Sequence, residues 1–406
     1  MLIKRENYLP AIRRQYDVDI IKVITGVRRA GKSVILGQIR DEMLENGISA
    51  DHVIEMNFED IAFENIRTFQ KLNSYILNRI RDEEKYYIFL DEIQHVRQFE
   101  KVLASLKATK NVSIFVTGSN SKLLSGRLAS LLVGRCVEFR ILPFTYAEML
   151  EYLEENHMQV PEDALSDYLT YGGMPMRFAY TDESDILKYL ADIYEGIVEK
   201  DICTAKSKVN REKFLLVAQY VLGNVGKRFS ASAVADYFAE VNQSDLPRSM
   251  VYRYISLLEK ACLISRVKRY DVAGKRTMKA IEKHYAVDPG FKTISVPAVT
   301  GGMAEQLENT VYNELIARGY TVYVGKTYRG EIDFVVIKGR KKCFVQVTYL
   351  LSSQEVIERE FGAYKVVKDA APKYVMSLDR FDMSRDGISH INVERWLKGE
   401  IELYLS

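Results

Sequence analysis

Eight consecutive residues near the amino end have the types and the spacing of a phosphate-binding loop. They fit the pattern G-x-x-x-x-G-K-[ST] and are Gly26, Val27, Arg28, Arg29, Ala30, Gly31, Lys32 and Ser33. The two glycines allow the backbone to curl so that successive N–H groups point at phosphate oxygens. Lys32 would contact the same oxygens as a point charge, and the hydroxyl of Ser33 would be a ligand of Mg²⁺. The pattern therefore predicts a site for a nucleotide and Mg²⁺.

The residues on either side supply the context that such a loop needs. Residues 19–25 form an apolar, β-branched run typical of a strand, and residues 33–44 carry apolar side chains at helical spacing. A loop between a strand and a helix places bound phosphates at the helix amino terminus, where the helix dipole favours negative charge. An ordinary strand-to-helix turn is the alternative, and the pattern in this context favours the phosphate loop.

Two acids end the next strongly apolar stretch. Residues 86–90 are Tyr-Tyr-Ile-Phe-Leu, a run typical of a fully buried strand, and Asp91 and Glu92 follow it. Asp91 would hold Mg²⁺ through water, and Glu92 would polarise the water that attacks the γ-phosphate. Such acids can also cap the next helix, but their place after a phosphate loop favours the hydrolytic interpretation.

A further apolar strand, residues 112–117, ends in a polar tip. Asn120 is the first choice for a side chain that contacts the γ-phosphate or the attacking water, and Ser119 is the second. Either residue could also be the N-cap of a helix that begins at Lys122. Residues 136–142 supply a fifth strand, so strands and helices alternate. This order predicts an α/β fold with a parallel sheet and helices on both faces.

Length and composition indicate a globular protein of several domains. At 406 residues the chain is too long for one ordinary core, and its 47% hydrophobic and 28% charged residues are typical of a soluble protein. No apolar run is long enough to cross a bilayer and residues 1–6 lack the apolar core of a signal peptide, so a cytoplasmic location is expected. The four cysteines and five histidines are scattered, which argues against a zinc site or a disulfide framework.

Charge is distributed unevenly along the chain. The net charge is only +2, but residues 205–285 carry 16 lysines and arginines against 7 acids. The rest of the chain has 41 lysines and arginines against 48 acids. One middle segment is therefore basic on an otherwise mildly acidic protein, which makes contact with phosphate groups electrostatically plausible.

The motifs together resemble the AAA-type ATPases of prokaryotes that carry a C-terminal domain of unknown function. The resemblance rests on residues 26–33, 89–94, 117–120, 132–135 and 142–144, and on the later stretches 172–175, 283–288 and 331–334. It implies four parts: an additional-strand ATPase core at residues 1–145, a helical lid at 146–210, a winged helix-turn-helix at 211–295 and a nuclease-like end domain at 303–406.

The resemblance also implies two kinds of arginine near the nucleotide. Arg135 is the best candidate for an arginine finger, acting in a neighbouring subunit or in cis, and Arg127 is the second. In related ATPases a Gly-x-Pro turn in the lid touches the base, and a nearby arginine, here Arg177, senses the phosphates. The alternatives are surface arginines at helix ends and, for residues 172–177, a plain turn between helices.

The basic segment has the element order of a winged helix. Apolar periodicity predicts helices at residues 214–222, 230–238 and 249–260, followed by a hairpin of strands at 262–271 and 276–288. The third helix would enter the major groove of double-stranded DNA while the hairpin turn faces phosphates. The predicted contacts are Arg248, Ser249, Tyr252 and Arg253 on the helix, and Lys275 and Arg276 on the turn. A role in packing or partner binding is the alternative.

The last hundred residues have the core order of the restriction-endonuclease-like fold. A helix at 303–317, strands at 320–324, 331–337 and 343–349, and a helix at 355–364 are predicted. Glu308, Asp333 and Gln346 fall where that fold takes its metal ligands. The lysine usual in its Glu/Gln-x-Lys motif is replaced by Thr348, which cannot supply the same charge. A degenerate nuclease fold that binds nucleic acid or protein is therefore favoured over an active nuclease.

Three functions are compatible with these features. The favoured one is an ATPase using ATP and Mg²⁺, whose nucleotide state repositions a DNA-binding winged helix and an end domain, in a chain that can form a homo-oligomer. Its hydrolysis should be slow unless a partner or a second subunit supplies the arginine. The alternatives are a nucleotide-switched, metal-dependent nuclease and a signalling ATPase whose winged helix contacts only protein.

Overall fold

The computed structural model describes residues 2–118, 134–204, 208–241, 246–296, 302–328 and 330–406. Its chain divides into two compact units, Leu2–Leu142 and Pro143–Ser406, called here the N-terminal and the C-terminal unit. Among the described residues, no helix has both the length and the apolar character needed to cross a membrane.

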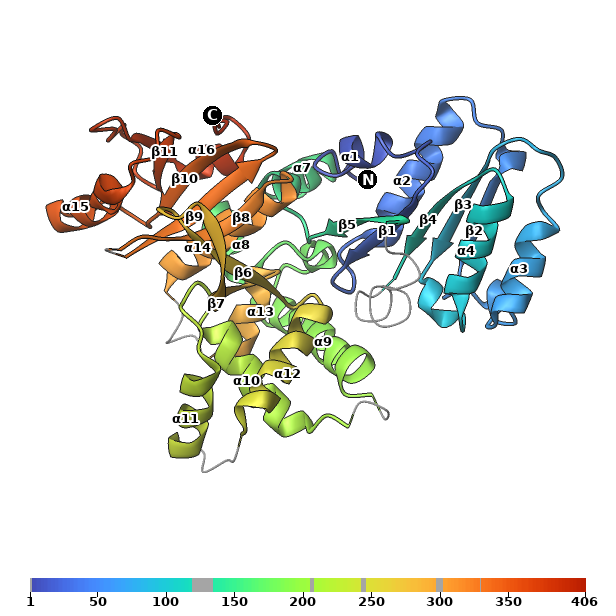
Figure 1. Ribbon diagram of the computed structural model, residues 1–406, viewed down its shortest axis with the longest axis horizontal. Helices are drawn as coiled ribbons and strands as arrows, with labels where there is room; N and C mark the ends of the chain where they lie inside the picture. The colour runs from blue at the N-terminus through green and yellow to red at the C-terminus, as the bar shows by residue number, and fades with distance from the viewer. Residues whose placement is uncertain (1, 119–133, 205–207, 242–245, 297–301, 329) are drawn as a thin grey trace. The chain divides into compact units, whose positions relative to one another are not determined.

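The N-terminal unit is a parallel sheet with helices (Figure 1). Its strands are β1 (Ile21–Gly26), β2 (Val53–Asn57), β3 (Tyr86–Asp91), β4 (Val112–Thr117) and β5 (Cys136–Ile141), in the order β2-β3-β4-β1-β5. Its helices are α1 (Leu9–Arg13), α2 (Lys32–Glu45), α3 (Phe69–Leu77) and α4 (Phe99–Thr109), with short 3-10 turns at Ala50–His52, Ile61–Phe63 and Ile93–His95. The five predicted strands are therefore confirmed, each to within about two residues at either end.

Burial explains why three of these strands read as unbroken apolar runs. Every residue of β1, β3 and β4 is buried, because these strands occupy the middle of the sheet and α2 packs against all three. Strand β4 lies between β1 and β3, which is the additional-strand arrangement that the resemblance implied. The carboxyl ends of β1, β4 and β3 consequently lie side by side at one edge of the sheet.

The C-terminal unit combines helices with one mixed sheet. Its helices are α7 (Tyr146–Glu155), α8 (Ala164–Tyr171), α9 (Glu183–Ile197), α10 (Arg211–Gly223), α11 (Ala231–Val241), α12 (Arg248–Lys260), α13 (Pro289–Ser295), α14 (Met303–Ala317), α15 (Gln354–Gly362) and α16 (Val393–Leu397). Short helical turns lie at Pro175–Ala179, Val198–Ile202 and Ala363–Val366. Its strands are β6 (Ile264–Asp271), β7 (Arg276–Ala286), β8 (Thr321–Lys326), β9 (Glu331–Lys338), β10 (Lys341–Val347), β11 (Lys373–Ser377) and β12 (Ser389–Asn392).

One sheet connects the two parts that the sequence analysis separated at residues 295 and 303. The seven strands have the order β12-β11-β10-β9-β8-β6-β7, and β6 pairs in parallel with β8 through Arg269, Tyr270 and Asp271 (Figure 1). The β6–β7 hairpin follows α10, α11 and α12 as a wing should, but it also extends the sheet of the end domain. The boundary predicted there is therefore not a structural division, because backbone hydrogen bonds cross it.

The Gly172-Gly173 turn is held by a buried carboxylate within the C-terminal unit. Asp288 accepts hydrogen bonds from the backbone N–H groups of Gly173 at 2.8 Å and Gly290 at 2.9 Å. A Cβ atom on Gly172 would lie 1.8 Å from an oxygen of Asp288, so no larger residue fits. Arg177 is buried and donates to the Gly172 carbonyl and to Asp167. These contacts hold Arg177 within the turn, and its predicted phosphate-sensing role remains a prediction.

Candidate functional site

The backbone of the phosphate loop has positive φ angles at three positions. Gly26 has a φ of 149°, and a Cβ atom there would lie 2.2 Å from the carbonyl oxygen of Ile141 on β5. Arg29 and Gly31 also have positive φ, at 65° and 93°. Two of the three positions with positive φ are glycine, the residue that reaches these conformations without strain. The chain therefore curls tightly between β1 and α2, as the pattern predicted.

The lysine of the loop is buried and has a neutral partner. Lys32 begins α2, is 5% exposed, and donates from Nζ to the carbonyl oxygen of Val27 at 3.2 Å. The N-cap of α2 is Gly31, so no N-cap side chain satisfies the first N–H groups of the helix. Ser33 is exposed on the first turn of the helix. The amino terminus of α2 thus presents N–H groups, an ammonium group and a hydroxyl group that suit a phosphate.

A buried arginine that the sequence analysis did not single out supports the loop. Arg5 is 2% exposed and donates to the carbonyl oxygens of Ala30 at 3.3 Å and Leu142 at 3.0 Å. Tyr8 lies under its guanidinium group, 5.1 Å from ring centroid to Cζ. No local signal separates Arg5 from a solvated arginine, because its partners are 25 and 137 residues away.

The two predicted acids meet the end of β4 through one hydroxyl group. Asp91 is 6% exposed, and the hydroxyl of Thr117 donates to its Oδ1 atom. The same Thr117 oxygen accepts a hydrogen bond from the backbone N–H of Glu92 at 3.0 Å. Thr117 therefore fixes both acids at the edge of the sheet that carries the phosphate loop. The sequence analysis proposed Asn120 or Ser119 for contact with the γ-phosphate or the attacking water and gave Thr117 no role; a threonine that ends an apolar strand was the available signal.

The carboxylate of Glu92 lies in a small polar group. Glu92 has a φ of 53°, and Gln94 donates to its Oε2 atom. Ligand atoms of Glu59, Glu92 and His95 all lie within 4.8 Å of one another. The left-handed backbone turns Glu92 away from the strand direction of Asp91, so the two acids have different environments.

The residues of this edge fit a hydrated Mg²⁺ ion. Magnesium prefers oxygen ligands and keeps several of its waters. The exposed hydroxyl of Ser33 comes from the first turn of α2, which follows β1, and the buried carboxylate of Asp91 comes from the end of β3, two strand positions away from β1. Both residues would therefore offer oxygen atoms to the ion at this edge of the sheet.

Of the arginine-finger candidates and polar residues predicted to lie next to the γ-phosphate, the structure describes only Arg135. Asn120, Ser119 and Arg127 lie outside the described residues. Arg135 is exposed, and its carbonyl oxygen accepts from the N–H of Ile21, at the start of β1. The phosphate loop follows the other end of this six-residue strand, roughly 17 Å away. Arg135 therefore cannot be an arginine finger in cis, which corrects that part of the prediction.

The predicted DNA contacts are exposed. Helix α12 buries Val251, Tyr254, Ile255 and Leu258. Its other face carries the exposed residues Arg248, Ser249, Tyr252 and Arg253. Lys275 and Arg276 are exposed at the turn of the β6–β7 hairpin. The helix periodicity thus separated core from surface as predicted, and these six side chains lie on the surface.

The structure also brings together the predicted second site. The backbone N–H of Asp333 on β9 donates to Oε1 of Gln346 on β10 at 3.2 Å. Asp333 and Glu308, which lies on α14, both lie within 4 Å of the ammonium group of Lys283 on β7. A lysine is therefore present, although the sequence motif has Thr348 in its place, and it comes from the predicted wing. Burial and the negative charge of Glu308 raise the pKa of Asp333.

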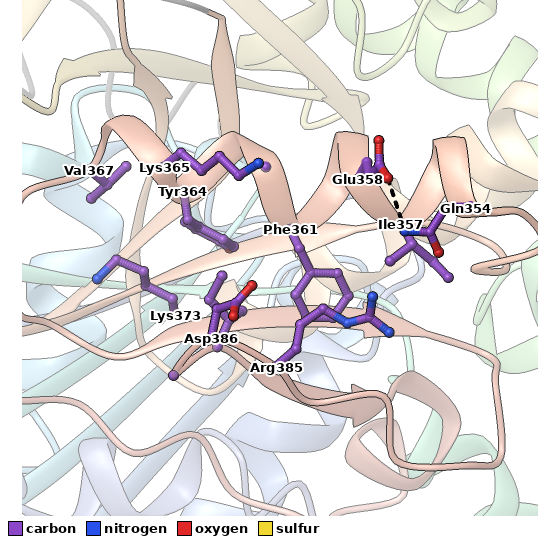
Figure 2. Close-up of a pocket in the computed structure, with 13 residues that line it drawn as sticks. Gln354, Ile357, Glu358, Phe361, Tyr364, Lys365, Val367, Lys373, Arg385 and Asp386 are labelled. Carbon is purple, nitrogen blue, oxygen red and sulfur yellow. Dashed lines mark hydrogen bonds between the residues drawn. The ribbon is translucent and has the colours of Figure 1, made fainter.

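A pocket of about 320 Å³ lies in the end domain between α15, the turn after it and the segment before β12 (Figure 2). Figure 2 shows Arg385 over the ring of Phe361, with 5.0 Å from Cζ to the ring centroid. Lys365 and Lys373 lie along its wall, and Gln354 donates to Glu358 at its rim. None of the described residues predicted from the sequence lines this pocket.

The chain is similar to known protein families and to solved structures. Residues 19–150 match a family described as an AAA domain, and residues 162–296 match the domain of unknown function DUF8612. The Walker-type ATPase PABY2304 of Pyrococcus abyssi has a similar fold: the TM-score is 0.51 at 16% identity, over 72% of this chain and 96% of that one.

Two curated relatives extend over most of the chain. The uncharacterized protein MJ1544 of Methanocaldococcus jannaschii is 30% identical over 86% of this chain and 79% of its own. An uncharacterized protein of Haemophilus influenzae is 33% identical over 98% of both chains. The chain therefore belongs to the same family as the Haemophilus influenzae protein, and its N-terminal unit is an AAA domain with an AAA-type ATPase fold.

Proposed function

We propose that the N-terminal unit binds ATP with Mg²⁺ and hydrolyses it. The observation that carries the proposal is the convergence of the curled phosphate loop with the Asp91–Thr117 pair at one edge of the sheet. A phosphate loop with its lysine could by itself bind many anions. Asp91, which lies on β3 two strand positions from β1, adds the carboxylate that a metal-dependent hydrolysis needs.

The roles follow from the positions of the side chains. Lys32 exchanges its bond to the Val27 carbonyl for the β- and γ-phosphates, and the loop N–H groups hold the same oxygens. Ser33 and Asp91 would hold Mg²⁺, and the bound ion would supply positive charge opposite the transferred phosphoryl group. Glu92 accepts a proton from the attacking water, after its carboxylate leaves the amide of Gln94.

Glu92→Gln separates binding from turnover. The amide has nearly the same shape but cannot take a proton, so ATP affinity should stay within about twofold while turnover falls at least ~100-fold. Calorimetry with ATP and a phosphate-release assay measure the two quantities. Gln94→Ala is the matched control, because it touches the same carboxylate but carries no proton in the reaction. Wild-type turnover by Glu92→Gln would remove Glu92 from the mechanism.

We further propose that an arginine from a second copy completes the site. Arg135 cannot reach the phosphates of its own chain, yet it is exposed at the amino end of β5. Adding Lys32→Ala chains to wild type tests the idea. Lys32→Ala chains cannot bind ATP and so cannot turn it over themselves, which leaves them able to act only as arginine donors to wild type. Wild-type turnover should rise with added Lys32→Ala and not with added Lys32→Ala/Arg135→Ala.

We also propose that the C-terminal unit binds double-stranded DNA through α12 and the β6–β7 turn. The six exposed residues on these elements support this, as does the basic character of residues 205–285. Part of that positive charge is compensated within the protein, however, because Arg228, Arg269 and Lys283 pair with acids of the end domain. Electrophoretic titration of a duplex at low salt tests the proposal. No affinity at low salt would favour a signalling ATPase whose winged helix contacts protein.

Nuclease activity is the second candidate for the end domain, because a lysine lies beside Glu308 and Asp333. Incubation of supercoiled plasmid with the protein and Mn²⁺ tests it, with Asp333→Ala as the control. We propose a degenerate site that does not cleave, so wild type and Asp333→Ala should leave the plasmid equally intact. Nicking by wild type alone would establish the nuclease.

A further inference from the structure

A lysine lies at the centre of three carboxylates in the C-terminal unit. The Nζ atom of Lys283 is 3.2 Å from Glu308, 3.8 Å from Glu331 and 3.9 Å from Asp333. The Lys283 side chain is 8% exposed, and the three acids are 13–16% exposed. These acids, named here the acid cluster, come from α14 and β9, whereas Lys283 comes from the β6–β7 hairpin. The position inside an acid cluster of this kind is the one that a divalent cation takes.

Other donors occupy the remaining sides of the acid cluster. Glu331 Oε1 accepts from Arg269 at 2.5 Å and from Arg228 at 2.9 Å. Glu308 Oε1 accepts from the hydroxyl of Tyr285 at 2.6 Å. Asp333 Oδ2 accepts from the backbone N–H of Val347 at 2.9 Å. Each acid thus has a protein donor besides Lys283, so none depends on a metal for its hydrogen bonds.

The charges of the cluster and its partners balance. With Glu308, Glu331 and Asp333 all ionised, three carboxylates face Lys283, Arg269 and Arg228, so the formal charge is zero without any bound ion. Burial and Glu308 raise the pKa of Asp333, and a protonated Asp333 would make the site still less attractive to a divalent ion. Burial alone would lower the pKa of Lys283, but Glu308, Asp333 and Glu331 outweigh burial and raise it. Lys283 is therefore a permanent cation at neutral pH. Adding a divalent ion beside it would place unpaired positive charge in a buried site, which is costly.

The backbone fixes the lysine in place. Strand β7 pairs with β6 along residues that include Lys283, and β6 pairs with β8 of the end domain. The β-bridge between Arg228 and Lys283 holds a second cationic residue beside the first. This pairing fixes the backbone of Lys283 beside the acid cluster, and the contacts of its ammonium group with Glu308, Glu331 and Asp333 hold the side chain there.

We infer that the ammonium group of Lys283 is the resident cation of the acid cluster and takes the place of a divalent metal ion. The end domain consequently has a closed site that needs no metal, and its acids serve to anchor the β6–β7 hairpin. This inference does not rest on the ATPase proposal, because the cluster lies wholly within the C-terminal unit and holds none of the residues of the phosphate loop.

Manganese titration of the full chain without nucleotide tests the inference. Bound Mn²⁺ is counted by electron paramagnetic resonance for wild type, Lys283→Met, Asp333→Asn and Lys283→Met/Asp333→Asn. Lys283→Met should bind one more Mn²⁺ than wild type, with an affinity at least ~10-fold tighter than any wild-type binding at the cluster. The double variant should lose that ion. Lys268→Met is the matched control, because Lys268 is an exposed lysine on the neighbouring strand β6, and it should behave like wild type.

Two results would overturn the inference. One is a wild-type Mn²⁺ site that Asp333→Asn removes, because a metal would then share the cluster with Lys283. The other is a folded Lys283→Met chain that gains no Mn²⁺. A Lys283→Met chain too unstable to titrate directly still answers the question, since Mn²⁺ should raise its melting temperature and leave that of wild type unchanged. Absence of that rescue counts against the inference.

Discussion

Two buried lysines with opposite surroundings distinguish the two units of this protein. Lys32 is 5% exposed, and its ammonium group meets the backbone carbonyl of Val27. Lys283 is 6% exposed, and its ammonium group meets three carboxylates. The charge of a lysine paired with a neutral group is not compensated by an acid and can attract an incoming phosphate, whereas the charge of a lysine paired with acids is already compensated. The comparison shows that the partner of a buried lysine, more than its burial, decides whether the lysine can bind a ligand.

Exchanging each lysine for methionine should give the largest and most opposed effects. Lys32→Met should weaken ATP binding at least ~100-fold, because the phosphates lose a direct charge, and should barely change stability. Lys283→Met should leave ATP affinity unchanged and lower the free energy of unfolding by about 3 kcal/mol, because it leaves buried acids without their cation. ATP calorimetry and urea unfolding measure the two quantities. Loss of stability in Lys32→Met, or loss of ATP affinity in Lys283→Met, would erase the distinction.

Thr117→Val tests how far the phosphate-loop site depends on a residue at the end of a different strand, β4. Valine keeps the shape but removes the hydroxyl that joins Asp91 to the N–H of Glu92. Turnover should fall about 10- to 100-fold, because a hydrogen bond to a charged group is lost, with little change in ATP affinity. Steady-state phosphate release against ATP concentration separates the two.

Thr117→Ser is the control for this effect. Serine retains the hydroxyl, so it should recover most of the turnover. If Thr117→Ser were as slow as Thr117→Val, the threonine would act through packing of β4 and not through its hydrogen bonds.

His284, next to Lys283 on β7, makes the C-terminal unit sensitive to acid. Burial and the nearby Arg266 lower the pKa of His284 to about 4, whereas an unfolded histidine titrates near 6.5. Between these values only the unfolded chain takes the proton, so stability is lost as the pH falls. From pH 7 to pH 5 this histidine should cost about 2 kcal/mol of unfolding free energy.

His284→Phe should remove that share of the pH dependence, because phenylalanine does not titrate and can keep the edge-to-face contact with Phe229. Urea unfolding of wild type and variant at pH 7 and pH 5 measures it. An equal loss of stability in both chains would assign the acid sensitivity to other groups.

Arg276→Ala should have the smallest effect, because Arg276 lies exposed at the hairpin turn. If it faces a phosphate of bound DNA, affinity should fall only a few-fold and the salt dependence should lose about one unit of slope. Fluorescence anisotropy at several salt concentrations measures both. Arg340→Ala, which changes an exposed arginine in the β9–β10 turn, is the control and should change neither.

The sequence predicted the elements well wherever local periodicity defines them. Strand β4 and helix α14 have the predicted bounds, and the phosphate loop was found from eight adjacent residues. The predicted lid turn at Gly172 and the exposed face of α12 were also located, because each depends on neighbouring residues. Arg5 and Thr117 were missed, since each acts through partners that lie at least 25 residues away.

The second site was also only partly predicted from the sequence: its acids and glutamine were identified, but its lysine was not. Glu308, Asp333 and Gln346 were predicted and do converge, because a helix and two adjacent strands of one predicted fold carry them. Lys283 was assigned to a separate domain, so the site was predicted to lack a lysine. The pairing of β6 with β8 brings the hairpin that carries Lys283 next to the site.

What the sequence determined by itself is the phosphate loop, the two acids after β3 and the order of helices and strands, because these depend on residue type and on spacing along the chain. What only the tertiary structure decided is the partner of each buried charge: a carbonyl for Lys32, three acids for Lys283, two carbonyls for Arg5. Electrostatic energy depends on distance in space, and a folded chain brings together residues that no local pattern connects.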